Sequence, residues 1–214
     1  CGDGFWSLLA FAMRMAMVMF AGYMLAVSPI VARALERLAA IPRTPRQAVL
    51  FMALASMLLG LVNWGLSIVG SAVLVRFLAR RAYGRGERVD YRLLVACAYF
   101  GLGATWHAGL SASAPLIAAT ASEPITQQFG VVGIDQTILS AFNLGLVAVT
   151  LAVMAALAVL LHPKPEDTLA IDPASLERLK QFEPPSPPAE RSVASWLDHT
   201  PWLGLIFAVC GLGY

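Results

Sequence analysis

The sequence predicts an all-α, polytopic membrane protein with a re-entrant hairpin and one broken transmembrane helix. Hydrophobic residues make up 58% of the 214 residues and charged residues only 13%, a balance outside the range of soluble domains. An uncharged run between Arg46 and Arg76 is interrupted near its centre by Asn63-Trp64-Gly65. A second apolar segment, residues 91–120, is rich in glycine and polar residues through its middle. These three observations define the predicted fold.

The first apolar run, Leu8 to Val27, is long enough for one span and contains a charge, Arg14. Counting from Phe5 at ~1.5 Å per residue places Arg14 roughly 13 Å deep. A charge at that depth is costly and is a functional candidate. Two other interpretations stay open: Arg14 pairs with a polar group on a neighbouring helix, or it reaches back to the interface.

Residues 30–40 predict a short basic, amphipathic helix, with Arg33, Glu36 and Arg37 on one side and apolar residues on the other. We expect Pro42 and Pro45 to close it. The predicted hairpin follows.

The hairpin prediction depends on charge. Read as one span, the run from Gln47 to Arg81 would give a long, tilted helix. Its flanks are both strongly basic, however, and cytoplasmic loops collect Lys and Arg. Entry and exit through one face places 14 of the 15 Lys and Arg residues inside and none on outer loops, whereas a crossing helix would leave 4 outside. We therefore expect two half-helices of ~13 residues, ~20 Å long, whose apex at Asn63 passes the midplane.

The middle of the second segment predicts unwound backbone. It contains three glycines, three hydroxyl side chains, an imidazole and a proline, a set that disfavours a continuous helix: Gly101, Gly103, Thr105, His107, Gly109, Ser111, Ser113 and Pro115. Irregular backbone at membrane depth survives only where protein covers it or where it lines a cavity. Discontinuous helices of this kind form ligand sites. Close packing of small residues against another helix is the alternative.

The rest of the chain divides by composition. Residues 122–136 contain Glu123 and Asp135 but no Lys or Arg, so we place this loop outside. Residues 138–161 form a plain span with a lone Asn143, which can hydrogen-bond between helices. We expect a membrane domain at residues 1–161, forming a first repeat. A cytoplasmic linker at 162–199 would hold a short helix at 173–182 capped by Asp172. The start of a further span would occupy 200–214, so the chain reads as a fragment of a longer protein.

Ordered blocks along nearly all of the chain resemble the short-chain fatty acid transporter family. The blocks are Gly2-Asp3-Gly4-Phe5-Trp6 with Leu8-Leu9-Ala10-Phe11, Asn63-Trp64-Gly65, Ala96-Cys97-Ala98-Tyr99, Thr105-Trp106, Ser111 to Leu116 with Ala118-Ala119-Thr120, and Pro163-Lys164-Pro165 with Ile171-Asp172-Pro173. The resemblance implies a multi-pass carrier of the bacterial inner membrane for acetoacetate, butyrate and similar monocarboxylates. It also implies one half of an inverted-repeat transporter whose second half is missing. Arg14 and His107 depart from the family pattern.

These pieces together suggest a substrate site where the hairpin apex meets the unwound segment. Amides, hydroxyls and the two tryptophans would hold a small carboxylate and its alkyl chain, with Arg14 as a candidate charge partner. The candidate residues are Asn63, Trp64, Gly65, Thr105, Trp106, His107, Gly109, Ser111 and Ser113. The coupling ion would be Na⁺ near Asn63, Gly65 and Ser111, or a proton carried by His107. A neutral, hydrogen-bonded histidine is the other interpretation of His107.

Other function classes stay open at this stage. An intramembrane acyltransferase or hydrolase would use His107 as a general base, but the sequence has no nucleophile elbow, no acid near His107 and no metal-spaced His or Cys set. A bundle that only organises partners would not need two broken helices. A di- or tricarboxylate carrier would usually need more cationic donors than Arg14. We expect a lipid bilayer, the substrate and the second half of the chain as partners. A homodimer is one option, nucleic acid is not expected, and neither is a cofactor beyond the coupling ion.

Overall fold

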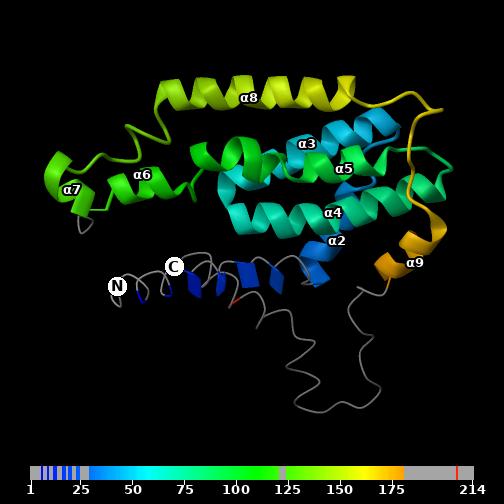
Figure 1. Cartoon of the computed structure of the whole chain (residues 1–214), viewed down its shortest axis with the longest axis horizontal. Helices are drawn as coiled ribbons and strands as arrows, with labels where there is room; N and C mark the ends of the chain where they lie inside the picture. The colour runs from blue at the N-terminus through cyan, green and yellow to red at the C-terminus, as the bar shows by residue number, and fades with distance from the viewer. Residues whose placement is uncertain are drawn as a thin grey trace, which may run out of the picture.

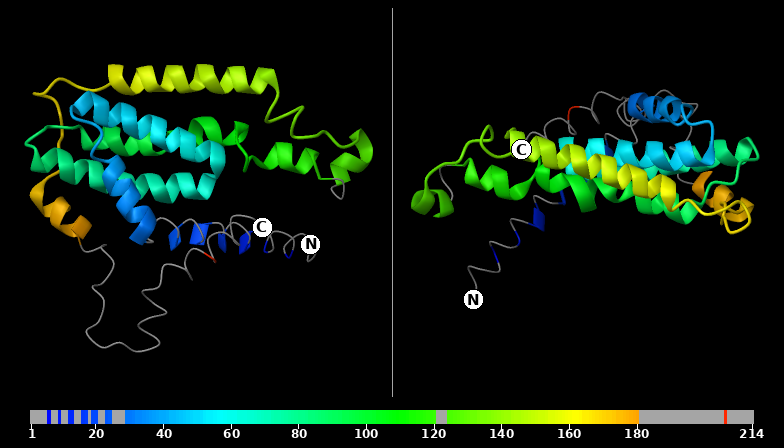
Figure 2. Two further views of the ribbon diagram at one scale, coloured as in Figure 1. Left: turned by 180° about the vertical axis from the view of Figure 1, so that it is seen from behind. Right: turned by 90° about the horizontal axis from the view of Figure 1, so that it is seen from above.

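The structure, a computed structural model, describes residues 29–120 and 124–180, together with single positions between Trp6 and Met24 and at Ile206. Arg14 and most of the predicted first span lie outside the described residues, as do the Pro-rich stretch 181–199 and nearly all of residues 200–214. The described elements are all helical. Figures 1 and 2 show a bundle of roughly parallel rods, with α2 crossing it obliquely.

The predicted amphipathic helix is α2, Pro29–Leu38, with Arg33, Glu36 and Arg37 exposed as expected. Leu35 and Ala39 are buried in the core. The prediction for Pro45 was wrong, because this residue begins the next helix, α3 (Pro45–Val62), rather than ending the stretch before it. Proline suits the first helical turn, where its missing N–H costs nothing. Thr44 caps α3 by accepting a hydrogen bond from the Gln47 N–H at 3.3 Å.

The helix break predicted at Asn63 is confirmed. α3 ends at Val62, α4 (Trp64–Gly84) begins at Trp64, and Asn63 between them is extended. The two helices pack side by side, and Figure 1 shows the start of α3 and the end of α4 at the same end of the molecule. They have 18 and 21 residues, more than the ~13 expected. α4 continues into its basic flank, whereas α3 takes in only Arg46 from the flank before it. Entry and exit through one face of a bilayer stays a prediction.

The second predicted break is also confirmed. Helix α5 (Tyr91–Ala98) is followed by a π-helical turn, η1 (Gly101–Thr105), and a 3₁₀ turn, η2 (Trp106–Ala108). The helix resumes only at α6 (Ser113–Ala118). Residues 91–118 thus form one bent element, apolar and long enough to cross a membrane. It runs from the end of the molecule where α4 ends to the opposite end (Figure 1).

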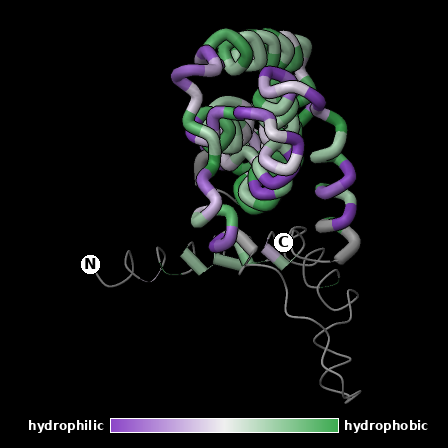
Figure 3. Tube along the Cα trace, turned by 90° about the vertical axis from the view of Figure 1, so that its right-hand side faces the viewer, coloured by the Kyte–Doolittle hydropathy of each residue, from purple (hydrophilic) through white to green (hydrophobic). Residues whose placement is uncertain are grey.

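The chain returns along α8, Ala141–Leu160, close to the predicted span. The loop before it, predicted to lie outside, contains a six-residue helix, α7 (Pro124–Phe129), that the sequence analysis missed. After α8, the short helix α9 (Pro173–Lys180) is capped as predicted, with Asp172 Oδ1 accepting from the Ser175 N–H at 2.7 Å. Pro45–Val62, Tyr91–Ala118 and Ala141–Leu160 are the three candidate membrane spans among the described residues. Figure 3, an end-on view, shows hydrophilic stretches in the connections and a largely hydrophobic α8.

The core forms around α3, which contacts α4, α5, η1 and α8. Its closest contact is with the π turn, where the backbones of Gly60 and Gly101 meet. A Cβ added to Gly60 would lie 2.6 Å from the Gly101 carbonyl oxygen, and one added to Gly101 would clash with Ser56 and Ser67. The serine side chains bond across the same seam. Ser56 Oγ donates to the Cys97 carbonyl at 2.6 Å, and Ser67 Oγ donates to the Ser56 carbonyl at 2.9 Å.

We expect Gly60→Ala and Gly101→Ala to destabilise the full-length protein by about 2 kcal/mol each, because the added methyl group must push two backbones apart. Thermal unfolding in a mild detergent measures this. Gly103→Ala is the matched control from the same turn, since its Cβ would meet no atom within 4 Å. Equal melting temperatures for Gly101→Ala and Gly103→Ala would show that the close contact does not exist.

Candidate functional site

Asn63 organises the first break by capping α4. Its side-chain Oδ1 accepts hydrogen bonds from the N–H groups of Gly65 at 2.9 Å and Leu66 at 3.1 Å, and its own N–H donates to the Leu59 carbonyl. The residue is buried, with 8% of its surface exposed. The cap uses only the side-chain oxygen. The Nδ2 amide group donates to none of the described residues. Asn63 therefore keeps a hydrogen-bond donor at the apex.

The two breaks lie in contact, as the sequence predicts. The Trp64 N–H would bond to the Gly60 carbonyl in a continuous helix, but here it donates to Ser111 Oγ at 3.0 Å. One residue away, the Leu110 N–H donates to the Leu61 carbonyl at 2.7 Å. Each break thus supplies partners for backbone groups that the other leaves unpaired.

Gly109 allows this approach. Its backbone lies so close to α3 that an added Cβ would be 2.5 Å from the Leu61 carbonyl oxygen. Trp106 holds the same loop from within, because its indole Nε1–H donates to the Ser111 carbonyl at 2.9 Å. Gly109 and Trp106 therefore shape the junction, whatever binds there.

Three other predicted site residues occupy different surroundings. Thr105 is 1% exposed and its hydroxyl contacts two carbonyl oxygens, Met57 O at 2.9 Å and Gly101 O at 3.2 Å. That hydroxyl fixes the π turn against α3. His107 is exposed, with its ring centroid 5.0 Å from that of Trp106, and Ser113 is exposed at the start of α6. Neither His107 nor Ser113 takes part in the hydrogen bonds that join the breaks.

Asn143 ties α8 to the broken element. Its Nδ2 donates to the carbonyl oxygens of Ala108 at 3.1 Å and Ile138 at 2.8 Å. The sequence suggested a hydrogen bond between helices and assigned no more to this residue. The bonded pair borders a hollow of about 240 Å³ whose lining includes His107, Gln136 and Thr137. A lone asparagine in an apolar span was the sequence signal for this anchor.

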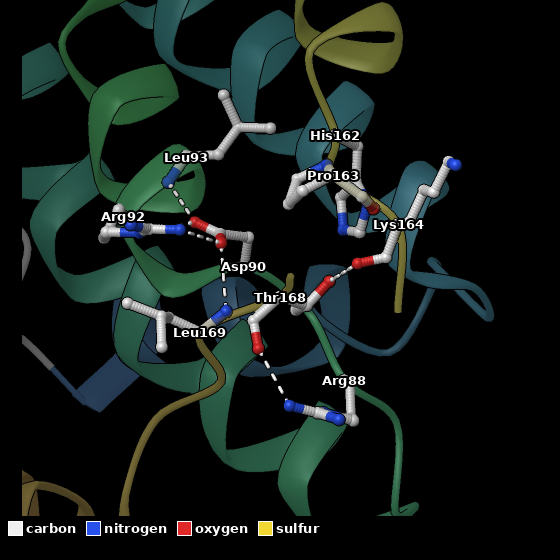
Figure 4. Close-up of polar contacts among 9 residues, drawn as sticks. All are labelled: Arg88, Asp90, Arg92, Leu93, His162, Pro163, Lys164, Thr168 and Leu169. Atoms are coloured by element: carbon white, nitrogen blue, oxygen red, sulfur yellow. Dashed lines mark hydrogen bonds and ion pairs between the residues drawn. The ribbon is translucent and has the colours of Figure 1, made fainter. Parts of the chain in front are cut away.

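A second polar cluster, which the sequence analysis missed, fastens the segment after α8 to the loop between α4 and α5 (Figure 4). We call it the Asp90 cluster: Arg88, Asp90, Tyr91, Arg92, Thr168 and Leu169. Asp90 Oδ2 accepts from the Leu169 N–H at 3.1 Å, and the Tyr91 N–H donates to the Leu169 carbonyl at 2.9 Å. Arg88 donates to the Thr168 carbonyl at 2.9 Å.

The Asp90 carboxyl is nearly fully buried and also caps α5 through the Leu93 N–H. Burial by itself raises the pKa of this carboxyl. Hydrogen bonds from the Arg92 side chain and from the N–H groups of Leu93 and Leu169 outweigh burial and lower the pKa from 3.8 to about 2. The cluster therefore favours the charged form of Asp90. Its role is to hold the segment after α8 against the loop between α4 and α5.

His162 lies beside this cluster (Figure 4). Its Nδ1 faces the Pro163 carbonyl at 2.9 Å and must donate to it, so Nε2 is the acceptor nitrogen in the neutral ring. Nε2 is buried and has no partner among the described residues. Among all the residues that the structure describes, no group of three or more His, Cys, Asp or Glu residues could hold a metal ion.

Comparisons with known proteins agree on one family. The family model described as "Short chain fatty acid transporter" matches residues 1–214. An Escherichia coli K12 protein named "Putative short-chain fatty acid transporter" is 37% identical over 217 residues, which cover 100% of this chain and 47% of that protein. A Haemophilus influenzae Rd protein of the same name is 34% identical over 179 residues, covering 80% of this chain and 39% of that protein. The chain spans about half the length of these curated relatives. No solved structure matches it.

We expect Asp90→Asn to lower the melting temperature of the full-length protein at pH 7. The folded pKa is depressed, so the stabilisation, up to about 2 kcal/mol, is present above pH 3.8 and is lost as the pH falls through about 2. Melting curves between pH 7 and pH 2 should converge for the two proteins at the acid end. Asp167→Asn, which removes an exposed carboxylate from the same segment, is the control. A difference that persists unchanged at pH 2 would contradict this account.

Proposed function

The chain belongs to the short-chain fatty acid transporter family, and on that premise we propose that the full-length protein carries short-chain monocarboxylates such as acetoacetate and butyrate across the bacterial inner membrane. The family is one of transporters, not enzymes, which removes the acyltransferase and hydrolase alternatives. The contact between the two helix breaks is the observation that supports a site in this half. The substrates and the membrane named here are proposals.

Two hydrogen-bond donors at the junction fit a small carboxylate. The N–H groups of Trp64, Gly65 and Leu66 at the start of α4 are already bonded to Ser111 and Asn63 oxygens. Ser111 Oγ accepts from Trp64, but its own proton goes to none of the described residues, and the same holds for Asn63 Nδ2. We assign these two groups, on either side of Trp64, as the donors that receive the carboxylate.

The neutral character of these donors suits a monocarboxylate that must be released again. Neither Lys nor Arg takes part in the hydrogen bonds that join the breaks. A di- or tricarboxylate would leave further negative charge unpaired at an apolar depth, which is expensive. The junction therefore favours the singly charged substrate, and the rings of Trp64 and Trp106 would cover its alkyl chain.

We propose Na⁺ or proton symport as the energy source. The Gly60 carbonyl loses its usual helical donor when the Trp64 N–H turns to Ser111. Carbonyls freed at helix breaks are typical cation ligands in carriers with discontinuous helices. Na⁺ near Asn63, Gly65 and Ser111 fits this pattern, whereas a proton would use the exposed His107.

The proposed topology is a re-entrant α3–α4 pair. Its support is the shared location of the start of α3 and the end of α4 (Figure 1) and the 14 of 15 Lys and Arg that this arrangement places inside. At ~1.5 Å per residue, the 18 residues of α3 reach about 27 Å, so Asn63 lies well past the midplane. The second half of the full-length protein would supply an inverted copy, reached through the linker at 162–199.

Uptake of radiolabelled butyrate into proteoliposomes by the full-length protein tests the site. We expect Asn63→Ser to raise the apparent KM about tenfold, because serine keeps the cap but removes the amide donor. Ser111→Ala should do the same, and Ser111→Thr should restore uptake by restoring the hydroxyl. Ser175→Ala on α9 is the control. Unchanged KM values for Asn63→Ser and Ser111→Ala in folded protein would refute this site.

Cysteine accessibility tests the topology. In a cysteine-free background, we expect Arg46→Cys and Arg85→Cys to react with a membrane-impermeant maleimide only from the cytoplasmic side, because both lie in the basic flanks. Gln136→Cys, in the predicted outer loop, should react only from the opposite side. Labelling of Arg46→Cys and Arg85→Cys from opposite sides would show that the segment crosses.

A further inference from the structure

The end of α2 and the turn after it expose large apolar residues between arginines. Leu35 in α2 and Ala39 just after it are buried in the core, yet Leu38 is 42% exposed and Ile41, in the turn that follows, is 58% exposed. Arg37 and Arg43, which flank this apolar pair in sequence, are exposed too. We call Arg37, Leu38, Ile41 and Arg43 the α2 patch. Since the core already holds the buried side of α2, packing within the described bundle does not account for the apolar residues of the patch.

The charge of the patch is uncompensated by the carboxylates around it. Residues 33–92 contain ten arginines and only three carboxylates. Each carboxylate is already paired: Glu36 with Arg81 at 4.0 Å, Glu87 with Arg85 at 3.0 Å and Asp90 with Arg92 at 2.9 Å. Arg37 and Arg43 form no ion pair within the described part of the chain. The α2 patch is therefore a positively charged surface with an apolar centre.

The position of α2 suits a membrane interface. Glu36 contacts Arg81 at 4.0 Å, so the last part of α2 lies beside the basic half of α4, which carries Arg76 and Arg81. The helix crosses the bundle obliquely there (Figures 1 and 2). A basic amphipathic helix beside such a basic stretch is suited to the headgroup layer, with its apolar residues at the acyl boundary.

We propose that the α2 patch binds the headgroup of an anionic phospholipid. Arg37 and Arg43 would hold the phosphate, because a guanidinium group matches its oxygens with paired N–H donors. Leu38 and Ile41 would pack on the upper part of the acyl chains. The inference is independent of which substrate is carried, since it concerns the outer surface of α2 and not the junction of the breaks.

The experiment uses the full-length protein purified in a mild detergent, titrated with phosphatidylglycerol or phosphatidylcholine. Retained lipid is counted by native mass spectrometry and stabilisation is followed by melting temperature. Phosphatidylglycerol should bind and stabilise, whereas phosphatidylcholine should do neither. We expect Arg37→Gln/Arg43→Gln to weaken phosphatidylglycerol binding about 30-fold, at about 1 kcal/mol per arginine. Arg37→Lys/Arg43→Lys, which keeps both charges but loses the paired N–H donors, should bind more tightly than the Gln variant and less tightly than the unmodified protein. Leu38→Ser/Ile41→Ser should weaken it with all charges in place.

Lys164→Gln/Arg178→Gln is the matched control, because it removes two exposed positive charges from the segment after α8. This control should bind phosphatidylglycerol like the unmodified protein. An equal loss in both double variants would reduce the effect to net charge and overturn the proposal. Equal binding of the two lipids, or the same stabilisation by inorganic phosphate alone, would overturn it as well.

Discussion

A helix that stops inside an apolar layer leaves peptide groups that no water molecule can satisfy, and this constraint governs the structure. The first break leaves the Trp64 N–H and the Leu61 carbonyl without their usual helical partners. The second break supplies both partners, Ser111 Oγ and the Leu110 N–H. Asn63 completes the arrangement by capping α4. Because each break supplies partners that the other lacks, the two breaks form one structural feature.

The composition of residues 101–115 left close packing and ligand binding as alternatives. Close packing and the proposed ligand site use different parts of this feature. Gly60 and Gly101 allow the backbones of α3 and the π turn to touch, and the Thr105 hydroxyl bonds the turn to α3. Asn63 and Ser111 lie at the edge of that contact, and each keeps one donor that no described residue accepts. The close backbone contact between α3 and the π turn holds these two donors in fixed positions. The site that we propose for a monocarboxylate would need donors held in fixed positions.

Much of this was predictable because its signals are local. The break at Asn63, the unwinding after Gly101 and the Asp172 cap all follow from residue types at or beside the site. Pro45 was misread because proline both ends and begins helices, and only the Thr44 cap decides between the two. Helix α7 is too short for a periodic pattern. The Asp90 cluster joins residues 79 apart in sequence, and no short-range pattern announces such a pairing. Arg14 lies outside the described residues, so its predicted role stays a prediction.

α8 is fastened at both of its ends. Asn143 bonds it to Ala108 at the broken element, and the segment that follows it is bonded at Leu169 to the loop ahead of α5. The helix therefore keeps a fixed distance between the two polar anchors. A displacement of α8 relative to the broken element would have to break one of these anchors or be taken up by the stretch from Leu161 to Asp167. Leu161 to Asp167 connects the end of α8 to the second anchor, so its length limits how far that end can move from the loop ahead of α5.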